Sequence, residues 1–150
     1  MRPRGTPIGR KLAMTAKAVS AAFNSSLAPE GGSVPTWLIL NALRHGQWTA
    51  QLDLARMLGI ESPTLTRHLD NLEQNGLVLR RQSEADRRAV RVELTEAGEE
   101  AYQRMLAAVI AFNRRLQAGI GRDELQELDA LLDRLAENVS RWATGRRPHR

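Results

Sequence analysis

Hydrophobic positions near the start of the chain return every three or four residues, which is the period of an amphipathic helix. This pattern covers residues 8–27, and Pro7 before it is a good first-turn residue for a helix. The Gly- and Pro-containing stretch 29–33 ends the segment, and a second helix is predicted after it, with Pro35 in its first turn. That helix ends near Gly46. The N-terminal third of the chain is therefore predicted to be helical.

The next segment predicts a pair of helices joined by a tight turn. The first covers residues 51–58, and Gly59 follows where a left-handed residue ends a helix. Ser62 is a candidate N-cap, with Pro63 at the first helical position, and the second helix ends at Asn75–Gly76. One side of this second helix carries its apolar residues, which are Leu65, Leu69 and Leu72.

Two short segments show the period of two that is typical of strands. They cover residues 77–82 and 89–94, and the polar residues 83–88 between them predict an exposed hairpin loop. In the second strand apolar and charged residues alternate, as in a half-buried strand: Val90, Val92 and Leu94 against Arg91 and Glu93. Residues 48–50 are long enough only for a bridging strand.

Two longer helices are predicted after the hairpin. Thr95 caps the first, which ends near Gly119, with an inward face made of Met105, Leu106, Val109, Ile110 and Leu116. The last helix covers about residues 123–142. Its apolar residues alternate spacings of three and four, a heptad-like seam of Leu125, Leu128, Leu132, Leu135, Val139 and Trp142.

Composition narrows the class of protein. The chain has 150 residues, 42% hydrophobic and 26% charged, which favours a globular domain, alone or with helical extensions. Aromatic residues make up only 4%, so the core is expected to consist of Leu, Ala, Val and Ile. The net charge of +5 suits a polyanionic partner, although charge does not determine the fold.

Several classes of function are disfavoured. Without cysteine the chain has no disulfide, thiolate catalyst, cysteine-oxidation sensor or usual structural zinc site, and we expect no cofactor. No segment approaches the ~18 apolar residues that a membrane span needs, and the basic start lacks an apolar signal run. We therefore expect a cytoplasmic protein that does not contact membranes.

The order of elements predicts a mainly α fold with a small β-hairpin wing (α+β), a winged helix-turn-helix flanked by N- and C-terminal dimerisation helices. Ala55 supplies the small residue where the two central helices cross. The predicted organisation is a basic leader at 1–6, dimerisation and pocket helices at 7–46, the winged helix-turn-helix at 47–94, C-terminal dimerisation helices at 95–142, and a basic tail at 143–150.

The second central helix and the hairpin carry the candidate DNA-binding residues. Once the leucines of that helix face inward, its outer face is free for base edges in the major groove, and arginine matches guanine O6 and N7 best. Arginines of a wing suit a narrow minor groove. The candidates are Ser62, Thr64, Thr66, Arg67, His68 and Asn71 on the helix, and Arg80, Asp86, Arg87, Arg88 and Arg91 on the hairpin.

These motifs resemble a known family. The segments LARMLGIE (54–61), PTLTRHLDNLEQNGL (63–77), Asp86-Arg87-Arg88 and LTEAG (94–98) make residues 7–142 similar to the MarR family of transcriptional regulators, within it the SlyA-like branch. The resemblance implies an obligate homodimer that binds a palindromic operator in double-stranded DNA. We expect a repressor, with activation as the alternative. The resemblance also implies that Arg67 enters the major groove, Arg87 enters the minor groove, Asp86 orients the wing through an arginine, and Arg88 supports the wing or contacts phosphate.

The resemblance further implies that the terminal helices of two copies interdigitate. The heptad-like seam agrees, because a single chain offers little to cover it; the alternative is that it packs on the chain's own first and fifth helices. Closed two-fold dimers are also the commonest assembly. The predicted dimerisation residues are Ile8, Leu12, Leu125, Leu128, Leu132, Leu135 and Val139.

Family members bind small aromatic, often anionic ligands that release them from DNA. The resemblance points to Met14, Lys17, Trp37 and Asn41, with Thr64 and Arg67 on the far wall. The branch often has arginine where Met14 stands and histidine where Asn41 stands, so a neutral or larger apolar ligand is equally admissible. Core filling is the alternative role for Trp37 and Met14, and regulation without a ligand is the corresponding alternative function.

Three other functions are weaker. A winged-helix module that binds only proteins is disfavoured by five arginines (80, 81, 87, 88 and 91) against Glu84 and Asp86 in the wing region. An enzyme is disfavoured because no catalytic or phosphate-binding motif accompanies the three histidines. His45 and His68 could ligate a metal, but no cysteines or dense acidic cluster support a metal site.

Overall fold

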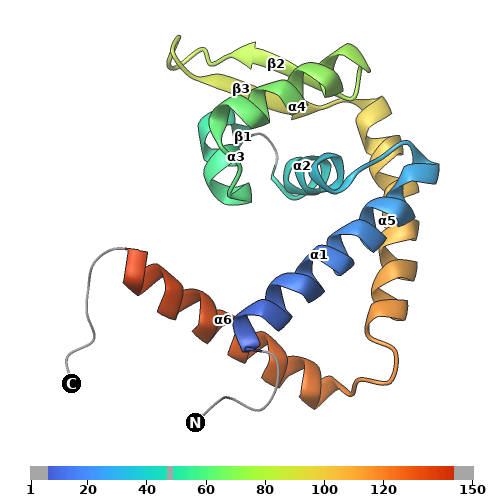
Figure 1. Cartoon of the computed structure of the whole chain (residues 1–150). Helices are drawn as coiled ribbons and strands as arrows, with labels where there is room; N and C mark the ends of the chain where they lie inside the picture. Colours follow the sequence, from blue (N-terminus) through green and yellow to red (C-terminus); the bar gives the residue numbers. More distant parts are fainter. Residues whose placement is uncertain (1–6, 47–48, 144–150) are drawn as a thin grey trace. The chain divides into compact units, whose positions relative to one another are not determined.

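The structure is a computed structural model that describes residues 7–46 and 49–143. Within these residues it confirms the predicted fold class, which combines six α-helices with a small antiparallel sheet (Figure 1). Most of the basic leader and tail, together with Trp48, lies outside the described residues. In chain order the elements are α1 (Ile8–Leu27), the 3-10 helix η1 (Ala28–Glu30), α2 (Val34–His45), β1 (Thr49–Ala50), α3 (Gln51–Leu58), α4 (Ser62–Gln74), β2 (Val78–Gln82), β3 (Val90–Leu94), α5 (Glu96–Leu116) and α6 (Arg122–Ala143).

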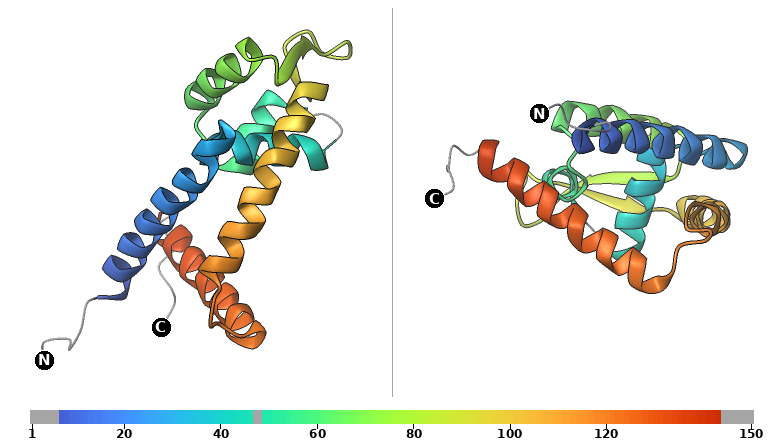
Figure 2. Two further views of the ribbon diagram at one scale, coloured as in Figure 1. Left: turned by 90° about the vertical axis from the view of Figure 1, so that its right-hand side faces the viewer. Right: turned by 60° about the horizontal axis from the view of Figure 1, so that its bottom comes forward.

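The first two helices begin close to their predicted signals. Pro7 precedes α1 as its N-cap residue, and Ser33 caps α2 because its hydroxyl accepts a hydrogen bond from the backbone N–H of Thr36 at 3.3 Å. Phe23 of α1 stacks on Phe112 of α5 with ring centroids 4.8 Å apart, which ties these two long helices together (Figure 2).

The turn between α3 and α4 forms as the sequence predicts. Gly59 has φ +62°, in the left-handed region that glycine adopts without strain, and buried Ala55 accepts a hydrogen bond from the N–H of Ile60 at 3.0 Å. The start of α4 differs from the prediction by one residue. Glu61 is the N-cap and its carbonyl receives the first helical bond, so Ser62 is the first helical residue and not the cap.

The sheet has the order β1-β3-β2, and both pairings are antiparallel. The two hairpin strands begin one residue later than predicted, at Val78 and Val90. Val78 pairs with Leu94 and Arg80 pairs with Val92, so these side chains share the face of the sheet that carries the buried Val78 and Val92. Helix α4 packs against β2, and α2 packs against β3 (Figure 1).

Hydrogen bonds of Thr95 connect the base of the hairpin to the start of α5. Thr95 caps this helix as predicted, because its hydroxyl accepts from the N–H of Gly98 at 3.0 Å. The same hydroxyl donates to the carbonyl of Gly76 at 2.6 Å. A Cβ on Gly98 would lie 2.1 Å from the carbonyl oxygen of Leu77, so only glycine allows this close approach.

Helix α5 presents a narrower apolar face to the core than the sequence predicts. Buried positions recur three and four residues apart, at Gly98, Ala101, Tyr102, Met105 and Val109. Ile110 lies about 100° around the helix from Val109, and it is exposed. Leu116, in the last turn, is exposed as well. The prediction that both residues face inward is therefore wrong for the single chain.

The chain divides after Asn113 into two compact units. The first has a hydrophobic core to which α2, α3, α4, the sheet and α5 contribute. The second contains α6, a helix with no buried residue among those described. No helix in the described part of the chain is both long and apolar enough to cross a membrane.

Candidate nucleic-acid interface

Helix α4 separates an apolar inner face from a polar outer face. Leu65 and Leu69 are fully buried and Leu72 nearly so, and burying each such side chain contributes about 1.5–3 kcal/mol. On the outer face Arg67 and Asn71 are exposed, one helical turn apart. The other predicted contacts differ in exposure: Ser62 is exposed, whereas Thr64, Thr66 and His68 are half-buried.

Thr66 is already engaged within the protein. Its hydroxyl accepts a hydrogen bond from the side-chain amide of Gln51 at 2.9 Å and donates to the carbonyl of Ser62 at 2.9 Å. Gln51 is the first residue of α3, so this bond fixes the start of α3 to Thr66, one helical turn into α4. Sequence reasoning did not identify Gln51, because the bond depends on how the two helices cross.

The wing tip is organised by its own backbone. The N–H of Ser83 donates to the carbonyl of Ala89 at 2.9 Å and closes the loop. The Asp86 carboxylate accepts from the backbone N–H of Arg88 at 2.9 Å, an Asx turn. Asp86 therefore orients the tip through a backbone group, whereas the resemblance implied that it acts through an arginine. Arg87 and Arg88 are exposed at this tip.

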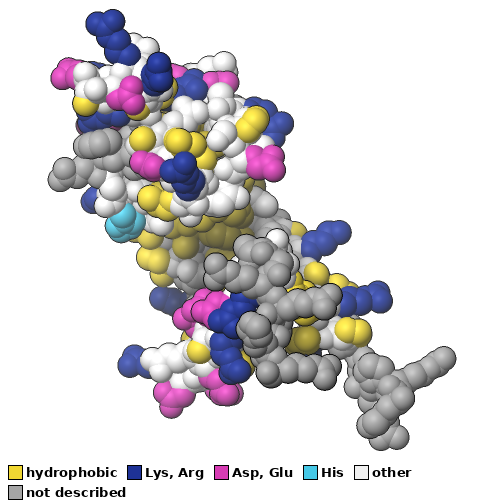
Figure 3. Space-filling model, turned by 90° about the vertical axis from the view of Figure 1, so that its left-hand side faces the viewer, with side chains coloured by type: hydrophobic (Ala, Val, Ile, Leu, Met, Phe, Trp, Pro, Cys, Tyr) yellow, Lys and Arg dark blue, Asp and Glu magenta, His cyan; other side chains and the backbone are white. Residues whose placement is uncertain are grey.

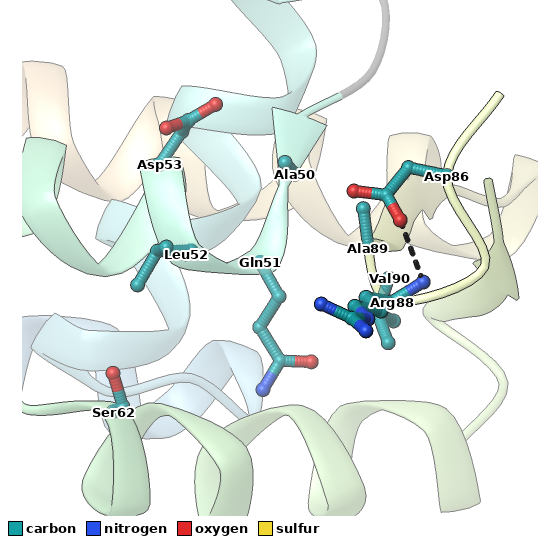
Figure 4. A pocket seen from close by; sticks show the side chains of 9 residues that line it. All are labelled: Ala50, Gln51, Leu52, Asp53, Ser62, Asp86, Arg88, Ala89 and Val90. Carbon is teal, nitrogen blue, oxygen red and sulfur yellow. Dashed lines mark hydrogen bonds between the residues drawn. The ribbon is translucent and has the colours of Figure 1, made fainter.

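Arg88 and Gln51 also line an open cavity of about 510 Å³ between α3, the start of α4 and the wing (Figure 4). Both side chains project into it, and Ser62 forms its edge on α4. Asp53 and Asp86 belong to the same lining, so the cavity combines one cation with two carboxylates. This composition does not favour a free anion as an occupant.

The arginines of the winged lobe, which comprises residues 49–94, fall into two groups. The first group forms ion pairs with carboxylates. In this group Arg80 contacts both Asp70 and Glu73, and Arg81 and Arg91 lie 3.8 and 3.7 Å from the carboxylate of Glu93. Within the described residues the second group has no ion pair with a carboxylate, and it consists of Arg67, Arg87 and Arg88.

Arg80 is the most enclosed of the paired arginines. Its Nε donates to Glu73 Oε2 at 2.8 Å, and its side chain is 21% exposed. Burial by itself would lower the pKa of the guanidinium, but hydrogen bonds and charge attraction from Glu73 and Asp70 outweigh it, so the pKa is raised. Sequence analysis assigned Arg80 to DNA contact; in the structure its guanidinium faces two carboxylates of α4.

Cationic side chains project from the winged lobe in the space-filling view, with acidic side chains among them (Figure 3). This mixed surface follows from the pairing described above, in which part of the positive charge is neutralised locally. The cations that stay outside these pairs lie at two places, the outer face of α4 and the wing tip. These are the two places at which a winged helix meets duplex DNA.

The four predicted ligand residues do not have a common environment. Trp37 is buried and stacks on Tyr102 with ring centroids 5.2 Å apart, which supports its core-filling role. Met14 is 59% exposed and Lys17 is exposed, so core filling does not describe Met14 in the single chain. Asn41 is half-buried. None of the four lines the cavity beside the wing.

The predicted dimerisation residues remain accessible in both units. In the first unit Ile8 and Leu12 of α1 are exposed. In the second unit Leu125 is half-buried, and the other predicted dimerisation residues of α6 are 36–63% exposed, namely Leu128, Leu132, Leu135 and Val139. Leu131 and Trp142 add to the same exposed apolar surface of α6.

The candidate metal ligands His45 and His68 belong to no group of three potential ligands in the described part of the chain. His45 is exposed and its ring meets the edge of Tyr102 at a centroid distance of 6.5 Å, and His68 belongs to α4. Over residues 7–46 and 49–143, no three His, Cys, Asp or Glu side chains are grouped so that they could hold a metal ion.

Comparison with known proteins gives a consistent result. Residues 33–90, from the cap of α2 to the first residue of β3, match the MarR family. The chain is similar to a mutant of MarR from E. coli complexed with operator DNA, with 26% identity, a TM-score of 0.81, and coverage of 86% of this chain and 93% of that chain. Its similarity to the transcriptional repressor CouR, bound to a 23-mer DNA duplex, has 29% identity, a TM-score of 0.81, and coverage of 87% and 92%.

A MarR-family transcriptional regulator from Rhodococcus sp. RHA1 is also similar, with 26% identity, a TM-score of 0.77, and coverage of 86% and 91%. These matches show the winged-helix fold of MarR proteins and a MarR domain within the chain. They do not distinguish the SlyA-like branch, which stays a prediction.

Proposed function

We propose that this chain is a MarR-type transcriptional regulator that binds DNA, and that two copies together bind an operator of two-fold symmetry. One observation carries the proposal: within the described residues the side chains of Arg67, Arg87 and Arg88 are exposed and form no ion pair with a carboxylate, although acidic residues occur throughout the same lobe. Cations held outside local ion pairs are available to a polyanion, and their contacts with phosphates release counterions.

Helix α4 is the proposed reader of the major groove. Arg67 can donate two hydrogen bonds to guanine, and Asn71 can pair in the same way with adenine. Ser62 and Thr64, in the first turn of α4, are suited to contact the phosphates of the DNA backbone beside the bases. Thr66 has both hydroxyl interactions satisfied within the protein, so we assign it to the support of α4.

The wing is the proposed contact with the adjacent minor groove. The Asx turn at Asp86 and the loop closure between Ser83 and Ala89 hold the tip in one shape before DNA arrives. A preformed tip loses less conformational entropy when it binds. Arg87 and Arg88 are exposed cations at this tip, and a narrow minor groove attracts such side chains.

Dimerisation is supported by the apolar face of α6. Exposed apolar surface of this extent marks a contact surface in soluble proteins, and a heptad-like seam suits a second helix. We propose that α1 and α6 of two copies cover each other through Leu12, Leu128, Leu132 and Leu135. The similarity to the repressor CouR supports repression as the mode of action. Release by a small ligand stays a prediction.

Selection of bound duplexes from a random DNA pool tests this function. We expect a two-fold symmetric preferred sequence, and an affinity for it that falls steeply with salt. The competing function, a winged-helix module that binds only proteins, predicts no preferred sequence and no advantage of duplex DNA over heparin. The exposed arginines of the lobe argue against that competitor.

A further inference from the structure

Arg80 occupies a position where the strand pattern calls for a core residue. It follows Val78 by two residues on β2 and pairs with the fully buried Val92 of β3, so it lies on the face of the sheet that meets α4. Its guanidinium contacts carboxylates of α4 and so links the hairpin to the helix.

Two carboxylates of α4 contact Arg80. Asp70 and Glu73 are three residues apart, on the same side of the helix. The terminal nitrogen of Arg80 contacts Asp70 Oδ1 and lies 2.7 Å from Glu73 Oε2. The backbone N–H of Arg80 also donates to Glu73 Oε1 at 3.4 Å, so Glu73 fixes the strand as well as the side chain.

The neighbouring Arg81 has the opposite character. It lies on the other face of the strand, its side chain is 67% exposed, and its nearest carboxylate is 3.8 Å away. Exposed pairs of that kind contribute little, whereas hydrogen-bonded pairs that are partly buried contribute more. Of these two adjacent arginines, Arg80 forms ion pairs with α4, and the ion pair of Arg81 among the described residues is with Glu93 of β3.

We propose that Arg80 is a positioning residue and not a DNA contact: through Asp70 and Glu73 it fixes the wing against the reading helix. This inference rests on the proposed function, because the wing and α4 must reach neighbouring grooves together. The grip of Asp70 on Arg80 also keeps that carboxylate away from Arg67, which precedes it by three residues on α4 and could otherwise pair with it.

Variants of Asp70 and Glu73 test this role, because a positioning role and simple electrostatics predict opposite changes in DNA affinity. Asp70→Asn with Glu73→Gln removes two negative charges from the lobe, so simple electrostatics predicts tighter binding to DNA. We call the contacts of Arg80 with Asp70 and Glu73 the clamp. Loss of the clamp predicts weaker binding to the operator, by about tenfold, the scale of a charge-assisted hydrogen bond. The matched control is Glu84→Gln, which removes a wing acid outside the clamp and should tighten binding modestly.

A second pair of variants tests the strand side of the clamp. Arg80→Met and Arg81→Met each remove one positive charge from β2, and a phosphate contact at either position would give losses of similar size. The clamp predicts a loss of operator affinity several times larger for Arg80→Met than for Arg81→Met. Equal losses would overturn the positioning role.

The measurements use the full chain and an operator that the unmodified chain has selected, with affinities taken for the operator and for an unrelated duplex. Hydrogen exchange of the free protein is followed in parallel over residues 78–94. The clamp predicts faster exchange in β2 for the acid double variant and for Arg80→Met, but not for Arg81→Met or Glu84→Gln.

Hydrogen exchange in β2 that is unchanged in these variants would overturn the clamp. Operator binding that is unchanged or tighter in the Asp70→Asn, Glu73→Gln double variant would overturn the role of the clamp in DNA recognition. If the unmodified chain selects no sequence, the proposed function fails, while the exchange data still decide whether the clamp exists. The single variant Asp70→Asn allows the same comparison of operator affinity and hydrogen exchange with the unmodified chain. Because this carboxylate is half-exposed, the substitution should leave the protein folded.

Discussion

The winged lobe and α6 place their leucines in opposite environments. In the lobe Leu54, Leu65 and Leu69 are fully buried, and each helix of the lobe presents one apolar face to the same core. In α6 every leucine except the half-buried Leu125 is more than a third exposed, and none of the described residues of that helix is buried. The lobe therefore completes its own core, whereas α6 needs another surface, which we propose is a second copy of the chain.

The charges of the lobe show a similar division on a smaller scale. Arg80 holds the structure together, while Arg67 and Arg87 are exposed outside the ion pairs of the described residues. Burial and ion pairing thus distinguish an arginine that supports the structure of the lobe from arginines that are available to contact DNA.

The largest effect is expected from a charge placed in the α6 seam. Leu132→Asp should prevent dimerisation, and operator affinity should fall by at least about a hundredfold, because two linked half-site contacts become single ones. Sedimentation and gel shifts measure the two effects. Ala130→Asp adds the same charge to the opposite side of α6 and should change neither. A Leu132→Asp chain that remains dimeric contradicts the assignment of this seam.

Truncation of a lobe leucine should weaken folding itself. Leu65→Ala opens a cavity in the core and should lower the free energy of unfolding by about 2–5 kcal/mol, at any protein concentration. Leu128→Ala, in α6, should lower stability in a way that depends on protein concentration, because it weakens association. Denaturant titrations at two concentrations separate the cases. Losses that are independent of concentration for both variants would remove the contrast between lobe and α6.

Loss of the reading arginine should change sequence preference. Arg67→Ala removes a direct base contact that contributes about 1–3 kcal/mol, so a repeated selection should return a site with one relaxed position per half-site. Arg56→Ala on α3 removes an equal charge from the lobe and should leave the preferred sequence unchanged. An identical preference for Arg67→Ala and the unmodified chain speaks against Arg67 as a reader.

Loss of a wing arginine should give the smallest effect. Arg87→Ala should weaken operator binding by about tenfold or less at low salt, and the slope of affinity against salt should decrease by about one counterion. The difference should shrink as salt rises, while the dimer stays folded. Arg104→Ala on α5 is the control for net charge. Equal affinity of Arg87→Ala and the unmodified chain at low salt contradicts the wing assignment.

Local features of this fold could be predicted from the sequence, and features that depend on tertiary register could not. Gly59, Ser33 and Thr95 act within a few residues of themselves, so their turn and caps follow from residue type. The face of α5 was predicted too wide, because Ile110 is apolar but lies off the stripe that meets the core.

The same distinction applies to the candidate site. The outward position of Arg67 follows from the spacing of the α4 leucines, which is a local property. The engagement of Arg80 depends on which residue of β2 lies opposite Glu73, and no local pattern contains that information. A signal was nevertheless present, because Arg80 falls in phase with Val78 on the buried side of its strand.

The central claim is that two copies of this chain read one duplex together. The most direct test is a titration of the selected operator and of its isolated half-site, with the mass of each complex measured by sedimentation at low and high salt. We predict two chains on each operator, binding at least about a hundredfold tighter than to the half-site, with affinity falling steeply as salt rises. A single chain on each duplex, with equal affinity for the operator, the half-site and heparin, would contradict it.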